Sequence, residues 1–330
     1  MSPMDTRLAR LMAPIDAGMA RVRERITEEL RGDSDAVADM TAHISRFRGK
    51  QLRAALVLLC GSATRNDDPE LPDVAAIVEM IHLATLVHDD VLDGADVRRR
   101  VASVNRRWDN QVAVLLGDLL YARAFHLSTR LSSPLCSSLL STTTQRICVG
   151  EIDQAASRYD FEMTDERYEA IAGAKTAALY SAACELGARY PGGGERDALG
   201  KELSAFGWEI GLAFQIFDDV LDVVGSEEEV GKSVGNDVED GKVTLPVLVT
   251  YRGADEATRS AIRDAYTLPD LKRRAEHLRT ICDLGPGVEE ARRRAHSLVS
   301  RALGRLEALP EGPAREALAA LGEYVQNRTW

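Results

Sequence analysis

Apolar side chains recur along most of this chain at every third or fourth position, the period of an α-helix that buries one face. The opening segment shows this period in Leu8, Leu11, Ile15, Met19, Val22, Ile26 and Leu30. The same period predicts a helix from residue 49, a long helix from Pro72 to the end of an apolar run near residue 90, one over residues 105–131, and one ending near Ser157.

The later chain follows the same pattern. Thr164, with Asp165 and Glu166 after it, is typical of a helix start, because a hydroxyl caps the first turn and acidic side chains favour its positive end. A Pro-Gly-Gly-Gly run at 191–194 precedes another long helix, and shorter helices are predicted after residue 245. No segment sustains the alternation of a strand. The chain is therefore predicted to be all-α, a single large helical bundle over residues 1–330.

Two of the predicted helices end in the same five residues, Asp-Asp-Val-Leu-Asp, at 89–93 and at 218–222. Positions i and i+4 lie one turn apart on one helix face, so Asp89 and Asp93 point the same way, as do Asp218 and Asp222. Two facing pairs of carboxylates repel each other unless cations lie between them. Hard oxygen ligands suit Mg²⁺, which bridges readily to phosphates. The motifs therefore predict a shared cleft in which magnesium holds a diphosphate.

Several basic or polar residues accompany the two motifs. Taken singly, an arginine pair is usually a solvated face and a lone histidine on an apolar helix is usually part of the core. Their joint occurrence with two aspartate motifs favours an anion site. The residues in question are Lys50, Arg53, His82, the run Arg98-Arg99-Arg100, Lys175 and Thr176.

Composition excludes several classes of protein. Of the 330 residues, 45% are apolar, enough for a sizeable core, and the net charge of −11 argues against nucleic-acid binding. Five scattered cysteines without metal-ligand spacing indicate reduced thiols in a cytoplasmic protein. No apolar signal segment opens the chain, and its longest apolar run, residues 54–60, is far below the ~20 residues of a membrane span.

Read together, the motifs resemble those of the trans-isoprenyl (polyprenyl) diphosphate synthases, medium- or long-chain type. The resemblance covers nearly the whole chain from residue 49 onward. It implies their isoprenoid synthase-like helical bundle, with a central cavity between the helices that carry the two aspartate motifs. Besides the two aspartate motifs, it rests on Gly-Lys-x-x-Arg at 49–53, His82, Arg98-Arg99, Gly117-Asp118, Gly150-Glu151 with Gln154, Lys175-Thr176, Phe214-Gln215, Gly231-Lys232, Gly235-Asn236-Asp237, Gly241-Lys242 and Thr244-Leu245-Pro246.

The resemblance implies a role for each matching position. Asp89, Asp93 and Asp218, supported by Asp222, would bind Mg²⁺, about three ions arriving with the allylic diphosphate. The allylic substrate would be held by Arg98, Lys175, Thr176, Gln215, Lys232 and Lys242. Isopentenyl diphosphate would be held by Lys50, Arg53, His82 and Arg99. The catalytic group would be Asp89, Asp93, Lys175, Gln215 and Asp218.

The implied reaction is physically coherent. Metal ions and cations stabilise a departing diphosphate, the allylic C–O bond ionises, and the double bond of isopentenyl diphosphate attacks the carbocation. A proton then leaves, and the departing diphosphate is a plausible base because the sequence offers no dedicated one. The segment 225–241, with four glycines, is expected to close and exclude water.

The residues before the first motif are expected to set product length. One helical turn rises about 5.4 Å, so each turn opened below Asp89 admits about one more five-carbon unit. Thr85 lies one turn below Asp89, whereas the role of Ala84 rests on the resemblance alone. Both are small, which favours an all-trans medium- or long-chain product, with geranylgeranyl or farnesyl length as the alternative. The tunnel floor is left open between Ile81, Val78 and residues 115–125.

The same residues argue against three other functions. A class I terpene cyclase shares the aspartate motif but lacks a second-substrate site, so Lys50, Arg53, His82 and Arg99 argue against it. A non-catalytic subunit of a heteromeric synthase would be expected to lose some of these residues. A calcium-binding EF-hand loop starting at Asp89 would place Arg100 at its last ligand position, which excludes it. The resemblance also implies a homodimer, although the apolar face of residues 105–131 could equally be core.

Overall fold

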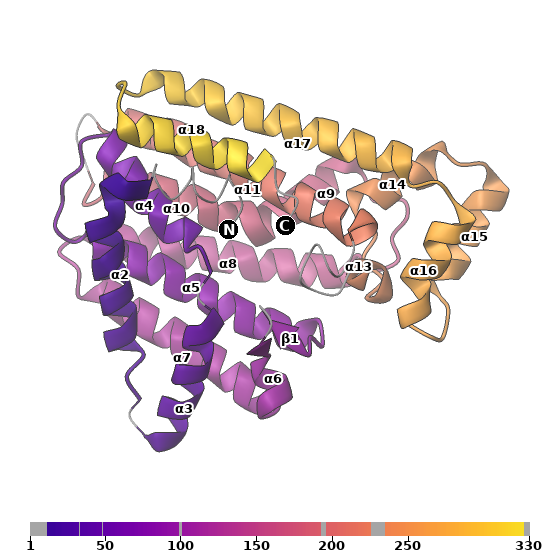
Figure 1. Ribbon diagram of the computed structural model, residues 1–330, viewed down its shortest axis with the longest axis horizontal. Helices are drawn as coiled ribbons and strands as arrows, with labels where there is room; N and C mark the ends of the chain where they lie inside the picture. Colours follow the sequence, from indigo (N-terminus) through magenta and orange to yellow (C-terminus); the bar gives the residue numbers. More distant parts are fainter. Residues whose placement is uncertain are drawn as a thin grey trace. The chain divides into compact units, whose positions relative to one another are not determined.

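The computed structural model describes residues 12–32, 34–47, 49–98, 101–192, 196–225 and 235–326, and these are almost entirely helical (Figure 1). The all-α fold class is thereby confirmed. Two compact units make up the chain: unit 1 is Met1–Thr144, Leu179–Gly207 and Leu303–Tyr324, and unit 2 is Gln145–Ala178, Trp208–Ala302 and Val325–Trp330. The single domain over residues 1–330 stays a prediction.

Unit 1 is built around helix α5. Its elements are η1 (Ala13–Ile15), α2 (Asp16–Glu29), α3 (Asp35–Ile44), η2 (Ser45–Phe47), α4 (Leu52–Ala63), α5 (Leu71–Leu92), α6 (Val104–Arg107), α7 (Asn110–Thr129), and most of α10 (Ala178–Arg189) and α18 (Pro313–Gln326). Helix α5 packs against α2, α4 and α7. By length and composition it could cross a membrane, but 61% of its apolar window is buried, as in a core helix.

Unit 2 holds the second half of the functional residues. Its elements are α9 (Asp165–Ala172), the π-helix η3 (Gly173–Ala177), α13 (Asn236–Glu239), α14 (Leu245–Gly253), α15 (Glu256–Tyr266), α16 (Lys272–Ile281) and most of α17 (Gly285–Arg305). The short η4 (Leu306–Ala308) follows α17 in unit 1, and the long helices α8 (Leu135–Ala156) and α11 (Arg196–Val224) contribute residues to both units.

Local capping explains where several helices begin. Pro72 stands in the first turn of α5, where its missing N–H is not needed. The Thr164 side chain accepts the N–H of Arg167 at 3.2 Å and caps α9, as its sequence predicts. The predicted helix over residues 105–131 is wrong in one respect. It is divided into α6 and α7, because Trp108 leaves the helical conformation and Asp109 caps a new helix.

Two further features differ from expectation. A short antiparallel ribbon, β1 (Val97–Arg98) with β2 (Val101–Ala102), follows the first aspartate motif; strands of two residues are too short for alternation to reveal. Among the helices predicted to be short after residue 245, α17 is an exception at 21 residues. Of the opening helix, residues 8–11 lie outside the described part of the chain.

Candidate functional site

The first aspartate motif forms the end of α5 in unit 1. Asp89 and Asp93 are both partly exposed, and the backbone N–H of Asp93 donates to the carbonyl of Asp89 at 2.8 Å, closing the last turn. Asp90 points the other way and is fully buried. Asp89 and Asp93, four positions apart, therefore share a partly exposed helix face, and Asp90 lies on the buried face.

Arg98 is placed against Asp90 by the β1–β2 ribbon. Its Nε and Nη2 lie 2.7 Å and 2.6 Å from one carboxylate oxygen of Asp90. Burial raises the pKa of the Asp90 carboxyl, and the Arg98 guanidinium opposes this rise. The arginine expected to hold the allylic substrate thus also stabilises the motif itself. Arg99 and Arg100 lie outside the described residues.

The Gly-Lys-x-x-Arg segment enters α4 through an unusual backbone conformation. Gln51, the residue before the helix, is buried and adopts the left-handed region with φ 51° and ψ 45°. Such a conformation in a residue other than glycine costs on the order of 1–3 kcal/mol and is often found at functional sites. Glu79 of α5 accepts the N–H of Ala54 at 3.2 Å, which anchors the start of α4 on α5.

The three described residues predicted to bind isopentenyl diphosphate all belong to unit 1. The Lys50 ammonium donates to the Tyr324 hydroxyl at 2.5 Å. The Arg53 guanidinium lies over the ring of Tyr180, 4.4 Å from its centroid. His82 lines a pocket together with Gln51, Phe47, Glu79, Leu83 and Leu86. The structure therefore brings His82 beside the segment that carries Lys50 and Arg53, although they are about 30 residues apart in sequence.

The two residues expected to limit product length differ in their surroundings. Ala84 is fully buried in α5. Thr85 is partly exposed, and its hydroxyl donates to the carbonyl of His82 at 2.7 Å. Because this hydroxyl bonds its own helix, Thr85 presents its methyl group rather than a donor to its surroundings.

In unit 2, Lys175 and Thr176 lie on the π-helix η3. A π-helical turn inserts an extra residue and is frequent at functional sites. Close packing holds it in place. A Cβ added to Gly150 of α8 would lie 2.8 Å from Ala174 Cβ, and one added to Gly173 would lie 2.4 Å from the Trp208 ring. The glycine of the Gly150-Glu151 motif is thus explained by the approach of η3.

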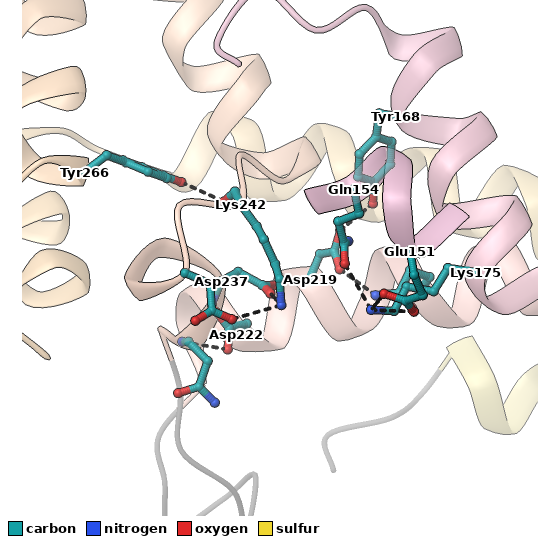
Figure 2. A network of polar contacts seen from close by, with 12 residues as sticks. Glu151, Gln154, Tyr168, Lys175, Asp219, Asp222, Asp237, Lys242 and Tyr266 are labelled. Atoms are coloured by element: carbon teal, nitrogen blue, oxygen red, sulfur yellow. Dashed lines mark hydrogen bonds and ion pairs between the residues drawn. The ribbon is translucent and has the colours of Figure 1, made fainter. Parts of the chain in front are cut away.

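The Lys175 ammonium is held by α8. Figure 2 shows it beside Glu151 and Gln154, which accept its hydrogens at 3.0 Å each. Glu151 and Gln154 belong to the sequence motif, although the resemblance implies no ligand role for them. Their spacing of three places both side chains on one face of α8.

A chain of hydrogen bonds leads from Thr176 to the second aspartate motif. The Thr176 hydroxyl donates to Gln215 Oε1 at 2.6 Å, and Gln215 Nε2 donates to Asp219 at 2.8 Å. The other Asp219 oxygen accepts the Tyr168 hydroxyl at 2.5 Å (Figure 2). Burial raises the pKa of Asp219 to about 8 and that of Tyr168 well above its usual value. Nothing in the local sequence pointed to Tyr168, 51 positions away.

Asp222 has a role that the sequence did not reveal. It is buried, and its two carboxylate oxygens accept the backbone N–H groups of Asn236 at 3.2 Å and Asp237 at 3.1 Å. These are the first residues of α13, so Asp222 caps this short helix from α11. Its backbone carbonyl also accepts the Gly235 N–H at 2.9 Å. Asp218, by contrast, is partly exposed.

Lys242 lies just after α13 and is mostly buried. Its ammonium lies 3.0 Å from Asp240 and 3.8 Å from Asp237, and its backbone carbonyl accepts the Tyr266 hydroxyl at 3.2 Å (Figure 2). Unit 2 thus brings Lys175, Thr176, Gln215, Asp218, Asp222 and Lys242 into one polar neighbourhood. Lys232 falls outside the described residues.

The donor set can be compared with the needs of magnesium. Within the described ranges, no three His, Cys, Asp or Glu side chains are grouped closely enough to hold a metal ion by themselves. Mg²⁺ in phosphate-binding sites commonly takes one or two carboxylates and completes its octahedron with water and phosphate oxygens. The partly exposed Asp89 and Asp93 of unit 1, and separately Asp218 of unit 2, suit ions delivered with a diphosphate better than a preformed protein cage.

Known proteins resemble this chain over nearly its full length. The family model described as Polyprenyl synthetase matches residues 34–283. Heptaprenyl diphosphate synthase component 2 of Bacillus subtilis (strain 168) is 33% identical over 310 residues, which cover 93% of this chain and 87% of that protein.

Solved structures agree with this match. A decaprenyl diphosphate synthase from Rhodobacter capsulatus aligns with a TM-score of 0.88 and 33% identity, covering 98% of this chain and 99% of that one. A polyprenyl synthase from Caulobacter crescentus CB15, solved in complex with calcium and isoprenyl diphosphate, gives a TM-score of 0.89 and 31% identity, covering 98% of each chain.

Proposed function

Because the chain belongs to the polyprenyl synthetase family and is therefore a prenyltransferase, we propose how its residues divide the work of condensing two diphosphates. The reaction joins isopentenyl diphosphate to an allylic diphosphate and yields an all-trans polyprenyl diphosphate of medium or long chain. The proposal depends mainly on one observation: each aspartate motif contains both partly exposed and buried carboxylates. Asp89, Asp93 and Asp218 are partly exposed, whereas Asp90, Asp219 and Asp222 are buried.

The allylic substrate is assigned to the aspartate motifs and to unit 2. Asp89, Asp93 and Asp218 hold Mg²⁺, about three ions, together with the diphosphate. Magnesium, when bound, supplies positive charge that stabilises the leaving diphosphate. Lys175, Thr176, Gln215 and Lys242 hold the diphosphate by hydrogen bonds and charge, with Arg98 and Lys232 added by resemblance. Asp222 supports the site indirectly, by capping α13.

The second substrate is assigned to unit 1. Lys50, Arg53 and His82, with Arg99, hold the diphosphate of isopentenyl diphosphate and orient its double bond toward the cation. Ionisation breaks the allylic C–O bond, the double bond of isopentenyl diphosphate forms the new C–C bond, and a proton leaves to restore a double bond. The released diphosphate is the proposed acceptor of that proton. Dedicated cations for two diphosphates favour this reaction over that of a terpene cyclase, which takes one.

Product length is assigned to α5. Ala84 and Thr85 are small, so the growing chain is not stopped one turn below Asp89. The similarity to heptaprenyl and decaprenyl synthases supports a product longer than the geranylgeranyl or farnesyl alternative.

A homodimer is proposed through α7. Val114 and Leu115 of this helix are 42% and 59% exposed within one chain, although their neighbours Ala113 and Leu116 are buried. A second copy of the chain would cover them. Light scattering should give twice the chain mass of 36.1 kDa, and Leu115→Glu should lower it toward the monomer. The five cysteines, none of them in a disulfide, are consistent with the proposed cytoplasmic location.

One assay tests the reaction itself. Purified protein is given labelled isopentenyl diphosphate, Mg²⁺ and a panel of allylic diphosphates, and the extracted products are separated by chain length. Products of heptaprenyl size or longer are expected. If no primer yields a product, the protein is not a functional synthase by itself; release of a hydrocarbon from the primer alone would instead identify a cyclase.

A further inference from the structure

The Gly-Lys-x-x-Arg segment is supported by two tyrosines from distant parts of unit 1. Tyr324 lies on α18, 274 positions from Lys50, and its hydroxyl accepts a hydrogen bond from the Lys50 ammonium at 2.5 Å. The same ammonium lies 4.4 Å from the centroid of the Tyr324 ring. Tyr180 of α10 supports Arg53 through its ring, 4.4 Å from the guanidinium. Each cation of the motif therefore contacts a tyrosine: Lys50 at the hydroxyl edge of Tyr324, and Arg53 over the ring of Tyr180.

The two partners in the Lys50–Tyr324 contact differ in mobility. Tyr324 is 8% exposed, so its ring is fixed by packing in α18. Lys50 is exposed and follows Gly49 in a segment that becomes helical only at Leu52. A lysine side chain has four rotatable bonds and loses much conformational entropy when it is fixed. The buried ring therefore sets the position of the ammonium, while the exposed lysine stays accessible to a ligand.

A structural tie between α18 and α4 is the simpler explanation of this contact. If this explanation were complete, loss of the Lys50–Tyr324 contact would lower the stability of the fold and leave substrate binding unchanged. The surroundings of the pair favour a role in binding. Gln51, the next residue, has the left-handed backbone conformation and lines the same pocket as His82. A left-handed conformation in a residue other than glycine persists only where the surrounding structure holds it, and such residues are frequent at ligand-binding sites.

We propose that Tyr324 is a positioning residue for isopentenyl diphosphate, holding the Lys50 ammonium in the place where it meets the diphosphate of this substrate. The inference rests on the proposed function, which assigns Lys50 to that substrate, and it adds the C-terminal helix α18 to the binding site. Preorganisation reduces the conformational freedom that Lys50 loses on binding. Loss of Tyr324 should therefore weaken the binding of isopentenyl diphosphate selectively.

The test compares two variants with a control on the same helix. Tyr324→Phe removes the hydrogen bond and keeps the ring, whereas Tyr324→Leu removes both. Leu321→Ala, at a fully buried position one turn earlier in α18, disturbs the packing of the helix without touching Lys50. For each protein, KM is measured separately for isopentenyl diphosphate and for the allylic primer. Binding of isopentenyl diphosphate alone is measured by titration calorimetry.

Tyr324→Phe is expected to raise the KM and the Kd of isopentenyl diphosphate about threefold, because the charged hydrogen bond is lost. Tyr324→Leu is expected to raise them about tenfold, because the ring beside the ammonium is lost as well. The KM of the allylic primer should change less than twofold. The inference would be overturned if Tyr324→Leu left the binding of isopentenyl diphosphate unchanged. It would also be overturned if Tyr324→Leu raised the KM values of both substrates to the same extent as the packing control Leu321→Ala. If Tyr324→Leu does not fold, Tyr324→Phe still decides the question, because it keeps the packing. Wild-type protein that binds isopentenyl diphosphate without turning it over would instead contradict the proposed function.

Discussion

Asp90 lies fully buried at the centre of the first aspartate motif, and the guanidinium of Arg98 approaches one of its carboxylate oxygens to 2.6 Å. The central carboxylate of the second motif, Asp219, is likewise buried and accepts hydrogen bonds from Tyr168 and Gln215. In each motif the middle aspartate is buried and has side-chain partners in the protein. Asp89, Asp93 and Asp218 stay partly exposed, whereas Asp222, the last aspartate of the second motif, is buried.

This arrangement separates activity from stability within a single motif. Asp89→Ala should lower turnover by ~10³-fold or more, because a metal ligand at the leaving group is lost, and should leave the unfolding free energy almost unchanged. Asp90→Ala should lower the unfolding free energy by about 2–3 kcal/mol, because it leaves Arg98 beside an empty buried site. Urea denaturation and steady-state kinetics measure the two effects. A stable, fully active Asp89→Ala enzyme would contradict the assignment of Asp89 to magnesium.

Tyr168 should act on the second motif through Asp219. Tyr168→Phe removes one of two side-chain hydrogen bonds to a buried carboxyl and should lower the unfolding free energy by about 1–2 kcal/mol. We expect the KM of the allylic substrate to rise and that of isopentenyl diphosphate to stay constant. Tyr190→Phe is the matched control, since the Tyr190 hydroxyl contacts Glu70 in unit 1. Equal kinetic effects in both variants would show that Tyr168 has no specific link to the allylic site.

Asp222 is expected to hold α13 rather than to bind metal directly. Asp222→Ala should speed hydrogen exchange at the amides of Asn236 and Asp237 by about tenfold, because both lose their acceptor. Asp255→Ala, which removes a similar cap from α15, serves as the control and should leave turnover unchanged. A half-saturating Mg²⁺ concentration that rises in Asp222→Asn while both amides stay protected would identify Asp222 as a metal ligand instead.

Substitution of Ala84 should change the product rather than the rate of ionisation. Ala84→Phe places a ring in α5 just before the first motif and should shorten the product, as chromatography of the extracted reaction mixture would show. Ala84→Ser keeps the side chain small and should leave the product length unchanged. An unaltered product from a folded Ala84→Phe protein would move the length-determining position elsewhere. Thermal unfolding of both variants checks that the larger side chain is accommodated at this buried position.

Much of the fold could be predicted because it depends on local geometry. The period of apolar residues predicts α4, α5 and α8, since side chains three or four positions apart share a helix face. The break between α6 and α7 was missed, because the period continues across Trp108 and only the cap at Asp109 marks a new start. The ribbon at 97–102 was too short to leave a pattern.

The residues of the candidate site could be named by motif, but their partners could not. Glu151 and Gln154 were within reach of sequence reasoning, since they form part of the motif that faces Lys175. Tyr168, Tyr180 and Tyr324 had no local signal, because each meets its partner only after the chain has folded back on itself. From the sequence, a tyrosine at an apolar helical position is predicted to be a core residue, and the partners of its hydroxyl and ring cannot be predicted.

The sequence by itself determined that the protein is helical, that Asp89 and Asp93 share one face, and which family the chain belongs to. These properties depend on neighbouring residues and on the fixed repeat of the α-helix. The tertiary structure alone decided that Asp90 is paired with Arg98, that Asp222 caps α13, and that Tyr324 holds Lys50. Asp90 and Arg98 are 8 positions apart, Asp222 and Asn236 are 14 apart, and Tyr324 and Lys50 are 274 apart. No helical repeat fixes these contacts, because their geometry is set by the β1–β2 ribbon and by the packing of whole helices.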